Sequence, residues 1–306
     1  MNIKKIGVSL VMLVVLILGI YIPLFNNTGF ATINTEPAIL QEKGSIQLYF
    51  CPSSECKTMY STVPKDASCA LYNYEGFTPP EKTIIEWRNH KGTGFKSNNK
   101  NLMHNKYCVF DYTVITGSHN PTKNKNRDVV LVINSSILSR EYQEAFKRLK
   151  NGRSKKSEDS IVNITGTIIT AHFCPEDDCR EKVVEELKKA EKSIYYLAYS
   201  FTDDTIAKEL LKTKAQVEGI IDTQKFEGDE RETLKKRKLY EYTGAGLLHH
   251  KAFIIDEEIV ITGSANPTGN GYDNNNENIV IIKDNSIAKE FMKEYERIKK
   301  ETREVR

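Results

Sequence analysis

The chain of 306 residues lacks a large net charge of either sign, because 44 lysine and arginine residues face 41 aspartate and glutamate residues, a formal net charge of +3. Lys4 and Lys5 stand at the start, and the rest of the chain is balanced to within one charge. This balance excludes attraction to polyanions through overall charge, so nucleic-acid binding would need a local basic patch. A hydrophobic content of 39% excludes a disordered chain and suffices for two modest domains or one duplicated domain.

None of the six cysteines has the two-residue spacing that is usual at zinc sites. Two pairs share a spacing of four intervening residues, and each follows a β-rich stretch: Cys51 with Cys56 and Cys174 with Cys179. The pattern predicts two disulfides, each closing a strand-to-helix turn in an oxidising compartment. Cys69 and Cys108 fit either a third disulfide or two buried thiols.

Charged residues are absent from residues 6–25, a run long enough to cross a membrane as a helix. The lysines before it favour a cytoplasmic N-terminus. We therefore expect a transmembrane anchor over 1–25 and a tether over 26–44, with the catalytic part at the cell membrane on its extracytoplasmic side. The alternative is a cleaved signal peptide with a weak site at residues 29–31, but the apolar run exceeds a usual signal core.

One pattern occurs twice in the chain. His104-x-Lys106-x4-Asp111 is followed by Gly117-Ser118-x-Asn120, and His249-x-Lys251-x4-Asp256 is followed by Gly263-Ser264-x-Asn266. A period of about 145 residues is too long for a solenoid and indicates a duplicated domain with pseudo-twofold symmetry. We expect a first repeat over 45–150, a linker over 151–160 and a second repeat over 161–306.

Strands alternate with helices in both repeats, which predicts a layered α/β fold. We expect helices at 136–150, 178–192, 203–215 (with Thr202 as N-cap) and 286–302. We expect strands at 46–50, 69–74, 106–111, 114–116, 129–133, 194–201, 217–222, 250–256, 259–262 and 278–282. Between Cys56 and Cys69 the first repeat has no room for a counterpart of the 178–192 helix.

The histidine and lysine of each motif are two residues apart in a predicted strand, so they project into one cleft. This applies to His104 with Lys106 and to His249 with Lys251. An ammonium beside an imidazole repels a divalent cation but holds a phosphate oxygen, which argues against a metal site. The motifs therefore predict a clamp for one phosphate, made by both repeats without a cofactor.

Each motif continues into a Gly-Ser turn that brings further hydrogen-bonding groups towards the phosphate. The predicted phosphate ligands are Ser118, Asn120, Ser264 and Asn266. Two imidazoles that face one phosphorus can divide the work: a neutral one attacks in line, and a protonated one gives its proton to the leaving oxygen. Water then hydrolyses the phosphohistidine.

The duplicated H-x-K-x4-D and G-S-x-N pattern resembles the phospholipase D superfamily over about Ile46 to Lys299. The second repeat is most similar to the small bacterial endonucleases of that superfamily, which pair two single-motif subunits. The resemblance implies a duplicated α/β/α sandwich with its cleft between the halves, a phosphohistidine intermediate and no metal. It also implies attack by His104 and proton donation by His249.

The resemblance further implies an acidic residue that orients each histidine, and Glu277 is expected to hold His249. In the first repeat Arg127 aligns with Glu277, and Asp128 follows one step later, facing the opposite way on a regular strand. Asp111 and Asp256 are expected to be structural and to hold the turn before Gly-Ser.

Several other polar residues fit either substrate contact or an ordinary solvated surface. They are His119, the basic run 235–238 with Tyr240 and Tyr242, and Lys91, Lys96 and Lys100. The leading functional hypothesis is an exported, membrane-anchored nuclease. The alternatives are a phospholipase D or phosphatidyltransferase acting on phospholipid headgroups, and a protein that binds phosphate polymers without cleaving them. The oligomeric state stays open.

Overall fold

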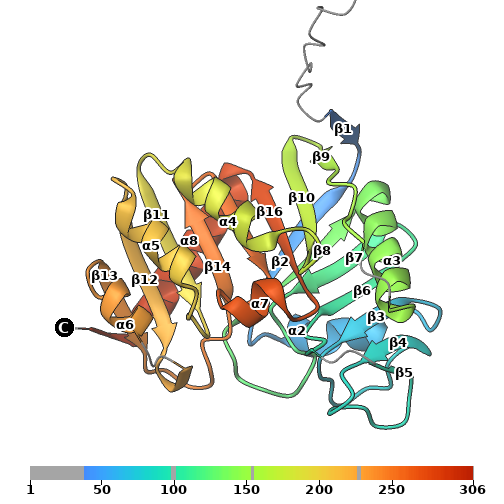
Figure 1. Cartoon of the computed structure of the whole chain (residues 1–306). Helices are drawn as coiled ribbons and strands as arrows, with labels where there is room; N and C mark the ends of the chain where they lie inside the picture. The colour runs from blue at the N-terminus through green and yellow to red at the C-terminus, as the bar shows by residue number, and fades with distance from the viewer. Residues whose placement is uncertain (1–37, 98–100, 153–154, 226–228, 306) are drawn as a thin grey trace, which may run out of the picture. The chain divides into compact units, whose positions relative to one another are not determined.

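The computed structural model describes residues 38–97, 101–152, 155–225 and 229–305. The anchor expected over 1–25 and the tether residues 26–37 lie outside them. Among the described residues, no helix combines the length and apolar character needed to cross a bilayer. From Ile39 onward these residues form one unit (Figure 1).

Two mixed β-sheets make the framework of the described chain. A seven-stranded sheet belongs to the first repeat, in the order β2-β8-β7-β6-β3-β4-β5. Its strands are β2 (Ser45–Cys51), β3 (Ser68–Leu71), β4 (Lys82–Ile85), β5 (Phe95–Lys96), β6 (Lys106–Phe110), β7 (Thr113–Gly117) and β8 (Asp128–Asn134).

The second sheet has ten strands within the described ranges, in the order β1-β9-β10-β16-β15-β14-β11-β12-β13-β17. These are β1 (Ile39–Glu42), β9 (Ile161–Ile164), β10 (Thr167–Cys174), β11 (Ser193–Ala198), β12 (Gln216–Asp222), β13 (Lys238–Tyr242), β14 (Lys251–Ile255), β15 (Ile259–Gly263), β16 (Glu277–Lys283) and β17 (Thr302–Glu304). β1 belongs to the segment expected to be a tether, and it is instead an edge strand paired with β9.

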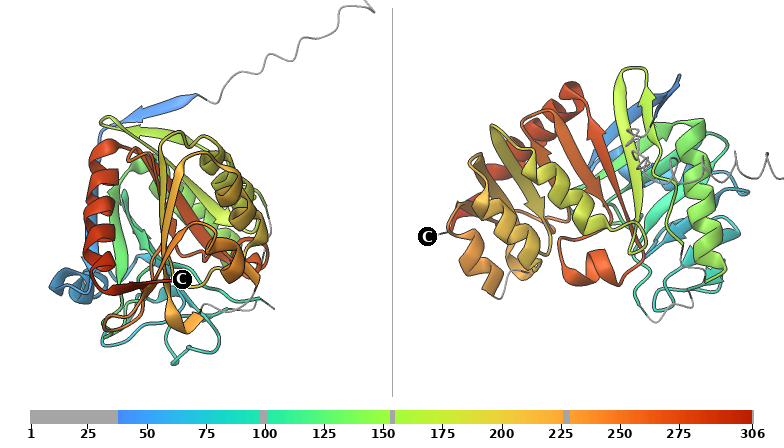
Figure 2. Two further views of the ribbon diagram at one scale, coloured as in Figure 1. Left: turned by 90° about the vertical axis from the view of Figure 1, so that its left-hand side faces the viewer. Right: turned by 45° about the horizontal axis from the view of Figure 1, so that its top comes forward.

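Helices cover both faces of each sheet. The α-helices are α2 (Ser54–Thr58), α3 (Ser136–Lys150), α4 (Cys179–Lys188), α5 (Asp204–Lys212), α6 (Asp229–Leu234), α7 (Gly269–Asp273) and α8 (Asn285–Lys299), with short 3-10 turns η1 (Met59–Thr62) and η2 (Thr223–Lys225). α4 and α5 pack on one face of the larger sheet and α8 on the other, as the left view of Figure 2 shows. α3 and α2 with η1 cover the two faces of the smaller sheet. The mixed α/β class is confirmed.

The last helix of the first repeat shows how sequence determines these elements. Ser135 caps α3 by accepting a hydrogen bond from Leu138 N–H, and the helix spans the predicted residues. The buried residues recur at helical spacing and contact both sheets: Leu138, Tyr142, Ala145 and Phe146. In α5, by contrast, the cap is Asp203 and not the predicted Thr202.

The two repeats share one interior. Hydrophobic residues of β6 to β8 and α3 pack with residues of β9, β10 and β16 in a single cluster. In its middle, the Asn278 amide donates to Thr116 Oγ1 at 2.9 Å and to Tyr142 Oη at 3.0 Å. The ends of the central strands of both repeats are thereby held in a fixed relation. The predicted repeat and linker boundaries otherwise stay predictions.

Three disulfides are present. Cys51–Cys56 and Cys174–Cys179 are the two predicted pairs. Of the alternatives for Cys69 and Cys108, the structure has the disulfide, which joins residues opposite each other on β3 and β6. Since β6 begins at Lys106, this bond lies on the strand pair that carries the first catalytic motif.

Replacing Cys69 and Cys108 together with alanine is expected to lower the free energy of unfolding by about 4 kcal/mol, because the bond closes a 39-residue loop. Removing Cys51–Cys56, which closes a five-residue loop, is the matched control and is expected to cost about 2 kcal/mol. Denaturant unfolding of the oxidised proteins measures both. Equal losses would contradict the loop-length argument.

Candidate active site

The two motif histidines are each held by an acidic residue of the other repeat. His104 Nδ1 lies 2.7 Å from Glu277 Oε1, and His249 Nδ1 lies 2.7 Å from Asp128 Oδ1. Both carboxylates are fully buried. A neutral imidazole donates through Nδ1 to such a carboxylate and leaves Nε2 with a free electron pair.

The predicted pairing of Glu277 with His249 is therefore wrong, and so is the alignment of Arg127 with Glu277. Asp128 is opposite Cys51 on β2, just as Glu277 is opposite Cys174 on β10, so these two acids are the true equivalents. Arg127 instead points to Tyr242 and Glu301.

Backbone hydrogen bonds across the repeats hold both histidines as well. His104 N–H donates to Asn276 O, and His249 N–H donates to Arg127 O, each at 2.9 Å. The acceptors immediately precede the orienting acids Glu277 and Asp128. The main chain therefore fixes each imidazole and its carboxylate at a single crossing point.

The motif lysines lie under the histidines and are buried. Lys106 and Lys251 each donate to the carbonyl of the histidine two residues earlier. Burial lowers the pKa of Lys106 to about 8 and, together with repulsion from Lys106, that of Lys251 to about 7. Two buried ammonium groups that repel each other create a favourable site for an anion.

The charges of each repeat also act on the histidine of the other. Burial lowers the pKa of His249 to about 3, and Lys251 and Lys106 contribute to the decrease. Burial also lowers the pKa of His104, with contributions from Lys106 and Lys251. Both rings therefore belong to one electrostatic site and are neutral in the free protein at pH 7.

The Gly-Ser turns are tight in both repeats. Gly117 has φ of +136°, and a β-carbon there would lie 2.2 Å from Val129 O. The Ser118 hydroxyl donates to Asp128 Oδ1 at 2.8 Å and accepts from Val129 N–H at 3.0 Å. The Ser264 hydroxyl accepts from Asn278 N–H at 2.9 Å. Phosphate binding by the serines stays a prediction, but their hydroxyls already hold the strands that carry the acids.

Asn120 and Asn266, the asparagines of these turns, have side chains with unused hydrogen-bonding capacity. Within the described structure, the Oδ1 atoms of both are buried without a hydrogen-bond partner. A phosphate oxygen can take an amide N–H from this position if the amide is turned. Their predicted phosphate-binding role stays a prediction that this geometry supports.

Asp111 and Asp256 both adopt left-handed backbone conformations at the far ends of β6 and β14. The Asp256 carboxylate accepts hydrogen bonds from the backbone of Glu191, Lys192 and Ser193. Asp111 is exposed. Both acids lie away from the histidines, as expected of structural residues.

A second pair of acids, not predicted from the sequence, lies behind the histidines. Glu86 Oε2 accepts from Met103 N–H at 3.1 Å, and Asp222 Oδ2 accepts from Leu248 N–H at 2.8 Å. Each donor immediately precedes a motif histidine. The signal was present, because the sequence Ile-Ile-acid ends both segments, at residues 84–86 and 220–222.

Two tyrosines were missed in the same way. The rings of Tyr72 and His104 have centroids 4.7 Å apart, and those of Tyr199 and His249 are 5.0 Å apart. Each tyrosine follows a strand that ends earlier than predicted, β3 or β11. Tyr72 also contributes to the raised pKa of Tyr199, after burial and Asp222, so the two phenols belong to the same cleft.

His119 is neither exposed nor in a solvated loop. It is 4% exposed, and its Nδ1 lies 3.4 Å from Asp128 Oδ2. Asp128 thus lies between two imidazoles, which hold its pKa well below the usual range despite burial. The second repeat has Ala265 at this position and so lacks a counterpart.

The basic run 235–238 has structural partners. The Arg237 guanidinium donates to three carbonyls at the end of α5, and Lys238 pairs with Glu218 at 3.1 Å. Lys235 pairs with Glu232. Most of this run stabilises the second repeat, which speaks against the alternative of substrate contact there.

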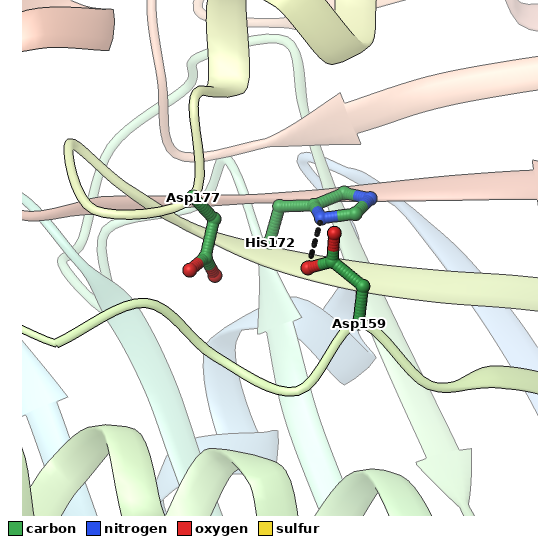
Figure 3. A group of neighbouring side chains, drawn as sticks. All are labelled: Asp159, His172 and Asp177. Atoms are coloured by element: carbon green, nitrogen blue, oxygen red, sulfur yellow. Dashed lines mark hydrogen bonds and ion pairs between the residues drawn. The ribbon is translucent and has the colours of Figure 1, made fainter. Parts of the chain in front are cut away.

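A separate cluster joins the linker to β10. Asp159, His172 and Asp177 have ligand atoms within 4.8 Å of one another (Figure 3). His172 Nδ1 lies 3.3 Å from Asp159, and Asp177 accepts two backbone N–H groups at 2.7 Å. The Lys182 ammonium, 2.9 Å from Asp159, stands where it would repel a metal ion. We interpret the cluster as a set of contacts that hold the linker against β10.

Comparisons with known proteins agree with this geometry. A family model described as "Cardiolipin synthase, PLD-like domain" matches residues 66–150 and 183–299. A "Phospholipase D" of Rickettsia prowazekii is 29% identical over 197 residues, which are 56% of this chain and 94% of that protein. A "Phospholipase D" of Rickettsia typhi is 34% identical over 148 residues, 44% of this chain and 70% of that protein.

Among solved structures, phosphatidylserine synthase of Haemophilus influenzae has a TM-score of 0.63 at 12% identity, covering 85% of this chain and 87% of its own. This likeness shows the fold. With the paired motifs, the crossed acids and the matched family model, the chain belongs to the phospholipase D superfamily and is one of its phosphodiesterases.

Proposed function

We propose that the chain is a membrane-anchored nuclease of the extracytoplasmic side, which cleaves nucleic-acid phosphodiesters through a phosphohistidine. The observation that carries the chemistry is the pair of His-Lys sets with crossed acids in one electrostatic site. Both sets are complete, which favours turnover over mere binding.

In the proposed reaction, His104 Nε2 attacks the phosphorus and the leaving oxygen takes a proton from His249. The two lysines neutralise the phosphate oxygens, and Glu277 and Asp128 stabilise the imidazolium that forms on each side. Both imidazoles are neutral in the free protein, so the anionic substrate must raise the pKa of His249 before it acts as an acid. Water activated by His249 then releases the phosphate from His104.

The direction of the strands supports a soluble polymer over a lipid. β1 ends at Glu42, whose carboxylate accepts from Ser136 N–H just beyond the end of β8. Asp128 and the histidines lie at the other end of β8, about 20 Å away for six extended residues. A chain that enters through β1 thus joins the body at the end away from the catalytic groups.

A lipid substrate is the second candidate, and the names of the relatives favour it. They include "Phospholipase D" and "Mitochondrial cardiolipin hydrolase" of Xenopus laevis, which is 28% identical over 129 residues. Such an enzyme would use the same histidines on phosphatidyl headgroups.

The test incubates the full chain with end-labelled oligonucleotides and with vesicles of phosphatidylcholine, phosphatidylglycerol and cardiolipin, all with chelator present. The proposal expects cleavage of oligonucleotides, lost in His104→Asn. Cleavage of lipid alone would replace the nuclease with the second candidate, and binding without turnover of any diester would favour a binding protein.

The lysines predict an alkaline limb in the pH dependence. As pH rises through the pKa values of Lys251 and Lys106, about 7 and 8, each ammonium loses its proton and the cleft loses positive charge. We expect kcat/KM for a small diester to begin to fall above about pH 7, and kcat to fall at higher pH because bound phosphate stabilises the ammonium groups. A kcat/KM that stays flat from about pH 6 to about pH 10 would contradict this.

A further inference from the structure

The segment before the first motif carries an uneven share of positive charge. Residues 82–103 contain five basic side chains and one acidic, whereas the equivalent residues 216–248 contain six basic and seven acidic. The repeats therefore differ in charge next to the cleft, although the whole chain is nearly neutral. A polyanion would be attracted to the side of the first repeat.

The same segment exposes aromatic rings. Trp87 and Phe95 are 45% and 39% exposed, among the few large hydrophobic side chains exposed in the described structure. The Arg88 guanidinium lies 4.8 Å and the Lys96 ammonium 6.0 Å from the Trp87 ring centre, and Lys150 lies 4.0 Å from that of Phe95. We call the surface of Trp87, Arg88, Lys91, Phe95 and Lys96 the aromatic-basic track.

The track is fastened to the catalytic residues. Asn89 Nδ2 donates to Tyr72 O at 2.7 Å, and the Tyr72 ring packs on His104. Buried Glu86 ties the start of the track to Met103, the residue before His104. The track lies on β5 and on the segment that follows β4, at the lower right in Figure 1.

Two of the three cations of the track, Lys91 and Lys96, are free to bind phosphate, whereas Arg88 pairs with Glu86 at 3.1 Å. Lys91 contacts the Tyr74 ring and carbonyl, and Lys96 contacts Trp87, but within the described residues neither has a carboxylate partner. This contrasts with Arg237 and Lys238 in the second repeat, which have structural partners. A hollow of about 570 Å³ beside Phe95 and Lys96 has the size of a small-ligand site.

We propose that the aromatic-basic track binds single-stranded nucleic acid, with bases stacked on Trp87 and Phe95 and phosphates on Lys91 and Lys96. The proposal rests on the nuclease function and names its substrate class. Unpaired bases are required, because a duplex hides the base faces that aromatic side chains stack on. An anionic bilayer is the competing occupant, because aromatic rings beside cations also bind lipid surfaces, and the experiment below includes it as an outcome.

Trp87 is the single tryptophan of the chain, so its emission reports on the track alone. In the full chain carrying His104→Asn to prevent cleavage, a single-stranded oligonucleotide is expected to quench this emission and the matching duplex to do so far less. Quenching by anionic phospholipid vesicles but not by oligonucleotide would overturn the proposal.

Variants provide the second measurement. By anisotropy of a labelled single strand, Trp87→Ala is expected to weaken binding about 10-fold or more, and Trp87→Phe much less. Lys96→Ala is expected to reduce the slope of log K against log salt by about 0.7. Tyr112→Ala and Lys192→Ala remove an exposed ring and an exposed cation far from the cleft, and neither should change binding.

The outcomes separate this proposal from the nuclease function. Suppose that the parent cleaves oligonucleotides, and that Trp87→Ala and Lys96→Ala cleave and bind them as well as the parent does. The proposed role of the track is then wrong, and the nuclease function stands. If the parent never cleaves oligonucleotides but Trp87 is quenched by single strands, the track stands and the nuclease is wrong.

Discussion

His249→Asn is expected to stop turnover of bis(4-nitrophenyl) phosphate after a single burst of one nitrophenolate per protein. Nitrophenolate leaves without a proton, so attack by His104 proceeds, but the phosphohistidine then lacks the base that activates water. Oligonucleotide cleavage, whose leaving oxygen needs the proton, should fall by about 10² to 10⁴ for each lost proton transfer.

The matched variant is His104→Asn, for which we expect no burst. Rapid-quench kinetics measures the burst, and peptide mapping at alkaline pH locates the modified residue. If His104→Asn gives the burst and His249→Asn does not, the roles of the two histidines are the reverse of those proposed. If neither variant nor the parent forms a covalent species, the phosphohistidine route is wrong.

Glu277→Gln and Asp128→Asn are expected to impair different steps, because each acid holds the histidine of the other repeat. Glu277→Gln should slow the burst through His104, and Asp128→Asn should slow the release of phosphate through His249. Each loss should be on the order of 10³- to 10⁴-fold, as when the carboxylate behind a catalytic histidine becomes an amide.

Asp111→Asn is the control for these variants, since its carboxylate is exposed at the far end of β6. It is expected to leave both steps unchanged. The pairing expected within one repeat makes the opposite prediction, in which Glu277→Gln slows phosphate release. Pre-steady-state rates of the two steps therefore decide between the crossed and uncrossed arrangements.

The repeat, the central strands and the helices predicted at 136–150 and 286–302 follow from the sequence because their hydrophobic periods are long and regular, although the second helix ends at Lys299. β4, β5 and β17 are two to four residues long, too short for such a period. β13 begins in the basic run 235–238, whose charges fit a solvated surface or substrate contact and do not indicate a strand.

The motif residues were predicted, but the partners of the histidines were not. Strand alternation predicts which way a side chain points within one strand, yet the contact between Asp128 and His249 joins residues 121 positions apart. An alignment one residue out of register was enough to put Arg127 in place of Asp128. Glu86 and Asp222 accept from backbone N–H groups, so the shared Ile-Ile-acid pattern could reveal the two acids but not their partners.

The crossed carboxylates make the two halves of this polypeptide dependent on each other. Neither half supplies the carboxylate that orients its own histidine. An isolated half would therefore be active only after it associates with a complementary half. Over evolution, a substitution at position 128 or 277 is felt first in the opposite copy, which restrains drift at the junction. Residues 82–103 and 216–248 are not bound by this dependence, and they differ in charge.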